Sequence, residues 1–121
     1  MIYNFQHQVL YGTILGGSSL VKPPKGKNYY LSMRSKDEKW LRYKMMQMDA
    51  FFKTQKLHLY GSTHRCNSSC KEELTEIQKV FYEGKQRKVT MELLDSLRDI
   101  ALAIWYLDTV SYTHLTLPTK A

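Results

Sequence analysis

Residues 10–18 read Leu-Tyr-Gly-Thr-Ile-Leu-Gly-Gly-Ser, and residues 102–109 read Leu-Ala-Ile-Trp-Tyr-Leu-Asp-Thr. Both stretches are apolar, contain small residues and end in polar ones. Gly12 and Gly16 are four residues apart, so on a helix they share a face and let another backbone approach closely. Each glycine weakens a soluble helix by about 1 kcal/mol, a cost that close packing would offset. The pattern therefore predicts two helices that pack directly on each other, with Gly12, Gly16 and Ala103 at the interface.

The second of these helices is expected to begin near Ser96. Residues 100–107 are apolar on all sides of a helix, and a helix with no polar face is normally buried. The sequence therefore predicts a fully buried helix here.

The segment between the two stretches predicts strands and helices in alternation. Strands are expected at 19–21 and 28–34, joined by a turn at 22–27 that is rich in lysine, proline and glycine. In the second strand Leu31 and Met33 alternate with polar residues, which indicates one core face and one basic face. Next, Ser35 and Glu38 have the spacing of a capping box that opens a helix running to about residue 52.

A hairpin and a further helix follow. Residues 56–66 alternate as two strands around Gly61-Ser62, which is typical of a tight turn. Ser69 and Glu72 form a second capping-box pattern. It opens a helix with Leu74, Ile77 and Phe81 on one face, and Gly84 suits its C-terminal end.

The resulting order is helix, two strands, helix, two strands, helix, and then the residue 96–108 helix. This order resembles the repeat of the LAGLIDADG homing endonucleases, on the strength of Gly-Thr-Ile-Leu-Gly at 12–16, Lys-Asn-Tyr-Tyr-Leu-Ser at 27–32 and Leu-Ala-Ile-Trp-Tyr-Leu-Asp at 102–108. The resemblance implies an α+β fold. It places one αββαββα repeat with a curved antiparallel sheet at 9–95, and the opening helix of a truncated second repeat at 96–108.

The resemblance also locates the chemistry. In that family each motif helix delivers a metal-binding carboxylate at its C-terminal end, and hard cations such as Mg²⁺ take oxygen ligands. The two catalytic positions correspond to residue 17 and to residue 108 or 109. Gly17 stands where the first acid belongs, and no acid precedes Asp37. Asp108 is therefore the one catalytic and metal-binding carboxylate that the motifs retain, and the resemblance implies Mg²⁺ as cofactor with impaired cleavage.

Residues 109–121 form the end of the chain. The stretch from Val110 to Thr119 matches one reading frame of a sequencing adapter. We therefore expect residues 109–121 to be a non-native tail that takes no part in the fold.

The composition of the chain indicates which class of partner it binds. The chain has 121 residues, one small domain by length, with a net charge of +7 and a pI of about 9.4. Residues 1–36 contain no Asp or Glu. This balance favours an anionic partner, nucleic acid before a membrane surface. Neither a signal peptide nor an apolar run of about 20 residues is visible, so we expect an intracellular protein without a membrane partner, whose host could be an organelle, a phage or a bacterium.

The predicted strands supply candidate contacts to double-stranded DNA. The family's two-stranded ribbons lie in the major groove, which is wide enough for them. Side chains on the polar strand faces are predicted to reach bases: Tyr30, Ser32, Arg34, His58, Tyr60, Thr63 and Arg65. Lysines around the first turn are predicted to contact phosphate, which positions the protein without reading sequence: Lys22, Lys25, Lys27 and Lys36.

Other chemistry has little support. His58, His64, Cys66 and Cys70 lie close in sequence, but their spacing fits no strong zinc template, and free thiols in a reducing compartment are the simpler interpretation. No nucleophilic triad, Cys/His pair or phosphate-binding loop is present. No small-molecule substrate is expected.

The sequence thus predicts a DNA-binding, homing-endonuclease-like domain. The alternatives are a non-cleaving relative, either an RNA-splicing maturase with intron RNA as partner or a DNA-binding module, and an unrelated basic α+β interaction domain.

Overall fold

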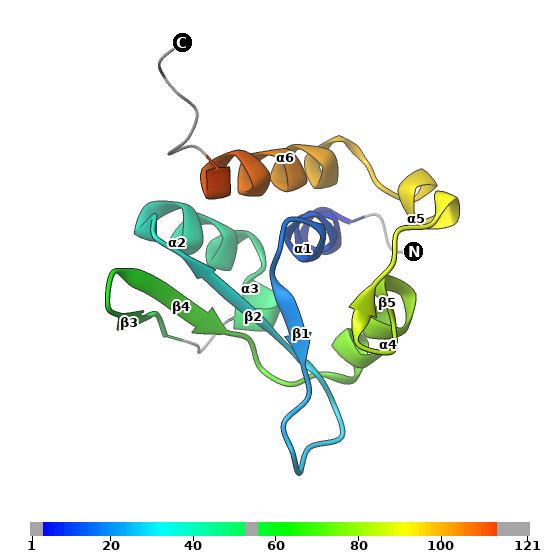
Figure 1. The fold of residues 1–121 in the computed structure, drawn as a ribbon, viewed down its shortest axis with the longest axis horizontal. Helices are drawn as coiled ribbons and strands as arrows, with labels where there is room; N and C mark the ends of the chain where they lie inside the picture. The colour runs from blue at the N-terminus through cyan, green and yellow to red at the C-terminus, as the bar shows by residue number, and fades with distance from the viewer. Residues whose placement is uncertain (1–3, 53–55, 114–121) are drawn as a thin grey trace.

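A four-stranded antiparallel sheet forms one layer of the molecule in the computed structural model, which describes residues 4–52 and 56–113 (Figure 1). The strand order is β1-β2-β4-β3, so the two ribbons meet through β2 and β4. The strands are β1 (Ser19–Val21), β2 (Tyr30–Ser35), β3 (His58–Tyr60) and β4 (Thr63–Asn67). The predicted α+β class and antiparallel sheet are confirmed.

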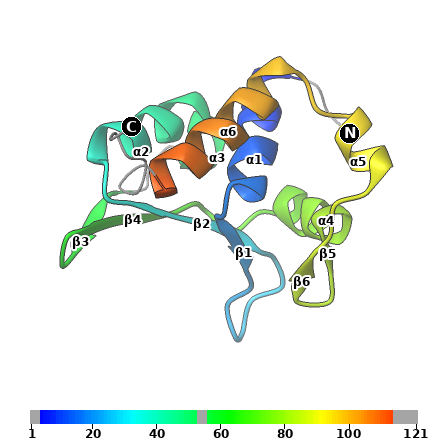
Figure 2. The same ribbon diagram turned by 45° about the horizontal axis from the view of Figure 1, so that its top comes forward.

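Helices cover one face of this sheet in two levels (Figure 2). Helices α1 and α2 lie next to the strands, and α6 lies across α1 on the side away from the sheet. The helices are α1 (Phe5–Leu15), α2 (Glu38–Gln47), α3 (Asp49–Phe52), α4 (Glu72–Phe81), α5 (Met91–Asp95) and α6 (Asp99–Thr113). A small hairpin of β5 (Tyr82–Glu83) and β6 (Gln86–Arg87) follows α4. The predicted order holds, with α3, α5 and this hairpin as additions.

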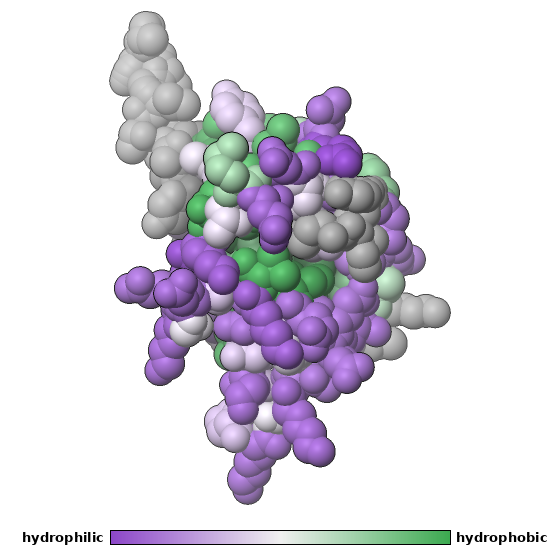
Figure 3. All heavy atoms as spheres, turned by 90° about the vertical axis from the view of Figure 1, so that its right-hand side faces the viewer, coloured by the Kyte–Doolittle hydropathy of each residue, from purple (hydrophilic) through white to green (hydrophobic). Residues whose placement is uncertain are grey.

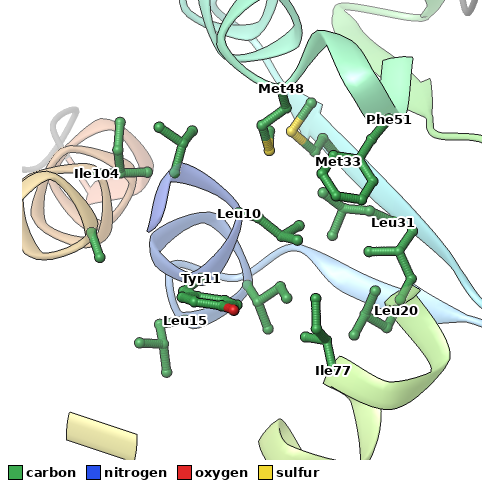
Figure 4. Close-up of a cluster of buried hydrophobic side chains, with 14 of the residues drawn as sticks. Leu10, Tyr11, Leu15, Leu20, Leu31, Met33, Met48, Phe51, Ile77 and Ile104 are labelled. Atoms are coloured by element: carbon green, nitrogen blue, oxygen red, sulfur yellow. The ribbon is translucent and has the colours of Figure 1, made fainter. Parts of the chain in front are cut away.

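The core lies between the sheet and α1. Along β2 the apolar residues Leu31 and Met33 are fully buried, whereas Arg34 is exposed. Both buried side chains meet Leu10 of α1 and Phe51 of α3 in one cluster (Figure 4). The predicted division of β2 into a core face and a basic face is therefore confirmed.

The two motif helices pack directly on each other, as predicted, and the glycines lie at the closest approach. A Cβ built on Gly12 would lie 2.4 Å from the Ala101 carbonyl oxygen and 2.9 Å from the Ile104 Cβ. Real Cβ atoms do not approach other atoms this closely, so only glycine fits at position 12 without a shift of α6. Gly16 is equally close to Asp108, with 2.5 Å between the two Cβ positions.

The predicted contact residue on α6 was wrong by two positions. Ala103 is exposed, and Ala101 is fully buried against Gly12. The prediction that α6 is buried on all sides was also wrong, because Leu102, Tyr106 and Leu107 are 46%, 67% and 44% exposed. Composition alone does not distinguish a buried helix from one that buries a single face of an apolar sequence.

Helix starts differ from the two predicted capping boxes. The cap of α2 is Asp37, whose carboxylate accepts a hydrogen bond from the Trp40 backbone N–H, and Ser35 instead accepts from the Asp37 N–H. Lys71 precedes α4 and makes no side-chain cap. The residue 38–52 helix is broken at Met48, which separates α2 from α3.

The predicted hairpin at 56–66 forms as β3 and β4, and Gly61 takes a positive φ of 63° in its turn. Leu59 is 62% exposed, so the alternation in β3 does not bury it. The apolar face of α4 is confirmed, since Leu74, Ile77 and Phe81 are buried. Gly84, expected at the end of α4, instead turns the β5–β6 hairpin.

The final helix begins at Asp99, three residues later than predicted, and continues to Thr113. The expected non-native tail at 109–121 therefore overlaps α6 at 109–113, and its remaining residues lie outside the described ranges. Within the described part of the chain, no helix is long and apolar enough to cross a membrane.

Candidate functional site

The open face of the sheet is built from rows of polar side chains that run across the strands. Residues opposite each other in antiparallel strands place their side chains on the same face. Arg34 of β2 is opposite Arg65 of β4, which is in turn opposite His58 of β3. Neighbouring rows hold Ser32 opposite Ser19 and Asn67, and Tyr60 opposite Thr63. The sheet thus brings together the residues that were predicted to contact bases.

Two arginines in direct cross-strand register are unusual, because like charges placed opposite each other are destabilising. The Arg65 guanidinium lies 5.2 Å from the centre of the Tyr60 ring, which supports it in place. Its buried Nε has no hydrogen-bond partner among the described residues. None of the four strands contains Asp or Glu. The face therefore presents positive charge that its own strands do not neutralise.

A broad groove runs over this face and reaches the ends of the motif helices. Its lining combines residues of β1, β2 and the β3–β4 hairpin with the end of α1 and the start of α2: Gly16, Gly17, Ser18, Ser19, Val21, Tyr30, Ser32, Arg34, Ser35, Lys36, Asp37, Glu38, Lys39, Trp40, Lys44, Tyr60, Thr63, Arg65 and Asp108. A ligand in the groove would touch the sheet and both motif ends at once.

The predicted phosphate contacts divide into two groups. Lys36 lines the groove. Lys22, Lys25 and Lys27 are exposed on the β1–β2 loop, which projects away from the body of the molecule. Figure 3 shows the loop as a hydrophilic extension at the bottom of the molecule. The loop lysines thus extend the basic surface beyond the groove.

The first motif ends in a backbone turn that favours glycine. Gly17 has a φ of 123°, in the region that side-chain-bearing residues rarely adopt, and a Cβ built there would meet nothing within 4 Å. There is room at position 17, but the conformation opposes a side chain. The acid that the resemblance assigns to this position is thus replaced by a residue suited to the observed turn.

The second motif ends in a buried ion pair. The Lys44 Nζ donates to both carboxylate oxygens of Asp108, each at 2.9 Å, and the Trp40 Nε1 donates to Oδ1 at 2.7 Å. The side chains of Lys44 and Asp108 are only 5% and 9% exposed. Burial lowers the pKa of the Lys44 ammonium, and the neighbouring Asp108 carboxylate opposes that shift through its charge and hydrogen bonds.

Local structure explains how these groups meet. The Asp37 cap begins α2, which places Trp40 in the first turn and Lys44 one turn later on the same face. The Lys44 ammonium also lies 5.5 Å from the Trp40 ring centre. On the other side, Gly16 allows α6 to bring Asp108 against α1.

The donor set at Asp108 does not fit a divalent ion. Both carboxylate oxygens are already hydrogen-bonded, and position 17 has no carboxylate. Among the residues that the structure describes, no three His, Cys, Asp or Glu side chains gather as metal ligands. Cys66 is buried in the core, where burial raises the pKa of its thiol to about 11, and Cys70 is exposed elsewhere.

Sequence reasoning missed Lys44 and the polar role of Trp40. Leu41, Lys44 and Met48 have helical spacing, and Leu41 and Met48 are core residues. A lysine at helical spacing between two core residues requires a buried counter-charge. That signal would have identified Lys44, although not its partner 64 residues away.

A family model, two curated proteins and a solved structure match this chain. The model of the LAGLIDADG DNA endonuclease family matches residues 7–120. The RecA proteins of Mycobacterium shimoidei and Mycolicibacterium flavescens are 30% and 28% identical over 112 residues. These matches cover 89% of this chain and 26% of either RecA protein.

A solved structure of the homing endonuclease I-WcaI, bound to its DNA recognition sequence, has a similar fold. It superposes with a TM-score of 0.73 at 19% identity, over 86% of this chain and 50% of that chain. This chain therefore spans half of the I-WcaI chain and about a quarter of the RecA proteins.

Proposed function

The chain belongs to the LAGLIDADG DNA endonuclease family, and we propose that it is a double-stranded-DNA-binding repeat of that family whose own cleavage activity is impaired. The observation that carries the proposal is the basic sheet face, where Arg34 stands in register with Arg65 and none of the four strands of this sheet supplies an acid. Such a face is stabilised by a polyanion that enters the groove. The homing endonuclease I-WcaI, which has a similar fold and is bound to its DNA recognition sequence, supports the same choice of ligand.

The proposed contacts follow from the geometry of the two surfaces. The major groove, about 12 Å wide, admits a two-stranded ribbon. Arg34 and Arg65 would face base edges, where arginine pairs most often with guanine through O6 and N7. Lys25 and Lys27 on the projecting loop would contact phosphates and set affinity without choosing a sequence.

Impaired cleavage follows from the motif ends. Cutting a phosphodiester needs stabilised charge on the phosphate and an activated water. The family resemblance implies that two cuts need a carboxylate from each motif. Gly17 has no carboxylate, and the Asp108 carboxylate is held by Lys44. Mg²⁺ is the cofactor that the family resemblance implies. A repeat at 9–95 followed by an opening helix at 96–108 remains the proposed division of the chain.

The alternative is a non-cleaving relative that binds intron RNA. The missing acid at position 17 favours any function without cutting. However, the major groove of duplex RNA is deep and narrow, so side chains on a sheet cannot read it. A two-stranded ribbon fits the wider major groove of duplex DNA, which favours DNA.

The test is a mobility-shift assay with duplex DNA across a range of salt concentrations. Affinity should fall steeply with salt, because bound lysines and arginines release counterions from the phosphates. Reversing charge at Lys25 and Lys27 should weaken binding to all sequences alike. Lys79→Glu, on the exposed side of α4, is the matched control and should change binding least. If the loop variant binds DNA as the control does, the interface is misassigned.

A competition arm separates the alternative. Unlabelled duplex DNA should displace the labelled duplex at lower concentration than structured RNA does. Preferential displacement by RNA would favour the maturase-like function instead.

A further inference from the structure

We infer that Lys44 supplies a built-in cation to the end of the second motif, so that Asp108 ties α2 to α6 instead of binding a divalent ion. This inference rests on the proposed function for the location of the site. It adds that the site does not bind a divalent metal ion. It rests on the contacts of one carboxylate.

The Asp108 carboxylate accepts three hydrogen bonds. Lys44 donates symmetrically to both oxygens at 2.9 Å, and Trp40 adds a third bond to Oδ1 at 2.7 Å. A carboxylate has about four lone-pair sites, so three are engaged. Close to Oδ2 lies Gly16, whose built Cβ would be only 2.8 Å from that oxygen. The ammonium therefore occupies the side of the carboxylate that a cation would need.

The charges of Lys44 and Asp108 also oppose the binding of a divalent ion. The buried ammonium and the buried carboxylate neutralise each other. A divalent ion added beside Lys44 would leave a net charge of about +2 in a largely dehydrated site, where like charges repel strongly. Position 17 brings no second carboxylate to offset it. Metal entry would require Lys44 to leave, which would strand its charge.

The Lys44–Asp108 pair also links two helices of the fold. Helix α2 follows β2 directly, and β2 carries Arg34 at the centre of the basic sheet face. The hydrogen bonds from α2 to α6 therefore hold α2, the helix that follows β2, in place. The acid of the second motif thus acts in this chain as a positioning residue.

The first experiment is a double-mutant cycle on the full 121-residue chain, read by thermal unfolding. Lys44→Met or Asp108→Leu alone should lower the Tm by on the order of 10 °C, because each leaves an unpaired buried charge. The double variant should recover most of the loss. Additive losses would overturn the inference. Lys79→Met, which breaks an exposed pair with Glu76, is the matched control and should shift the Tm little.

The second experiment counts bound Mn²⁺ by electron paramagnetic resonance in the wild-type chain and in Asp108→Asn. Equal Mn²⁺ binding by both supports the inference, since it means that Asp108 ligates none. Binding by the wild type that Asp108→Asn abolishes would overturn it. Should Asp108→Asn fail to fold, Trp40→Phe serves instead: freeing one oxygen should leave Mn²⁺ binding unchanged, and a gain would count against the inference.

DNA binding is measured on the same wild-type sample. The proposed function and the inference about Asp108 can then be contradicted independently of each other. Loss of DNA binding with an intact Lys44–Asp108 coupling would defeat the proposed function alone. DNA binding together with Asp108-dependent Mn²⁺ binding would defeat only this inference.

Discussion

The ends of the motif helices and the open face of the sheet both carry charged residues, in opposite circumstances. At the helix ends, Lys44 and Asp108 are buried, of opposite sign and paired. On the sheet, Arg34 and Arg65 have the same sign and stand side by side in register. The difference teaches that a charge at a position that the resemblance assigns to catalysis can become part of the packing. Charges that lack a counter-charge within the protein are better evidence of a ligand.

The largest expected effect tests the packed region. Gly12→Val should lower the free energy of unfolding by about 3 kcal/mol, because its side chain would overlap the Ala101 carbonyl and Ile104. Chemical denaturation measures the loss. The control is Ala103→Val on the exposed side of α6, which should change stability by no more than about 0.5 kcal/mol. Similar losses from both variants would mean that the helices pack through another face.

The next effect tests the sheet face. Arg65→Ala should weaken binding to a selected DNA site by about 1–3 kcal/mol and relax the preference for one base pair. Titration of the selected duplex and of variants at each position measures both quantities. Lys27→Ala should weaken binding slightly and leave the preference unchanged. A uniform loss across all sequences for Arg65→Ala would show that this arginine binds phosphate.

A smaller effect joins the two regions at position 17. Gly17→Asp should cost about 1 kcal/mol or more of stability, because the φ of 123° disfavours any side chain. The same variant should make no double-strand breaks with Mg²⁺, because the Asp108 carboxylate remains paired with Lys44. Plasmid linearisation measures cutting. Efficient Mg²⁺-dependent linearisation, by this variant or by the unmodified chain, would contradict the predicted impairment.

The smallest effect concerns the thiols. Cys70 is exposed and should react with a thiol reagent in the folded chain, whereas Cys66 should react only after unfolding. The pKa of Cys66 is raised from 9.0 to about 11, so folding favours its neutral form. The contribution of the neutral Cys66 thiol to the free energy of unfolding should be complete below about pH 9. It should be lost as the pH rises through about 11. Labelling followed by peptide mass analysis, and denaturation from pH 8 to 11, check the two expectations.

Local patterns predicted most of the fold correctly. Alternation in β2, the apolar stripe of α4 and the Gly61 turn each depend on neighbours in sequence, and each is present. Both predicted capping boxes failed, the first because several residues near a helix start can accept the same N–H bonds. Asp37 outcompetes Ser35 at α2, and α4 starts without a side-chain cap. The small additions α3 and α5 are too short to produce a periodic signal.

The candidate site was predicted less completely. The sheet residues were found because alternation assigns each one to a face, and antiparallel pairing then aligns them. The register that sets Arg34 against Arg65 could not be read, since it depends on how two separate ribbons meet. Ala103 was predicted in place of Ala101 because residues 100–107 are apolar throughout and do not mark which side faces α1.

By itself, the sequence determined the family, the order of elements, the glycine-mediated contact of the two motif helices and the absence of an acid at position 17. These features reside in residue identity and short spacings, which folding does not alter. Only the tertiary structure decided the role of Asp108. Its partner Lys44 is 64 residues away on another helix, and burial between α1, α2 and α6 makes the strength of their pairing depend on an environment that no local pattern contains.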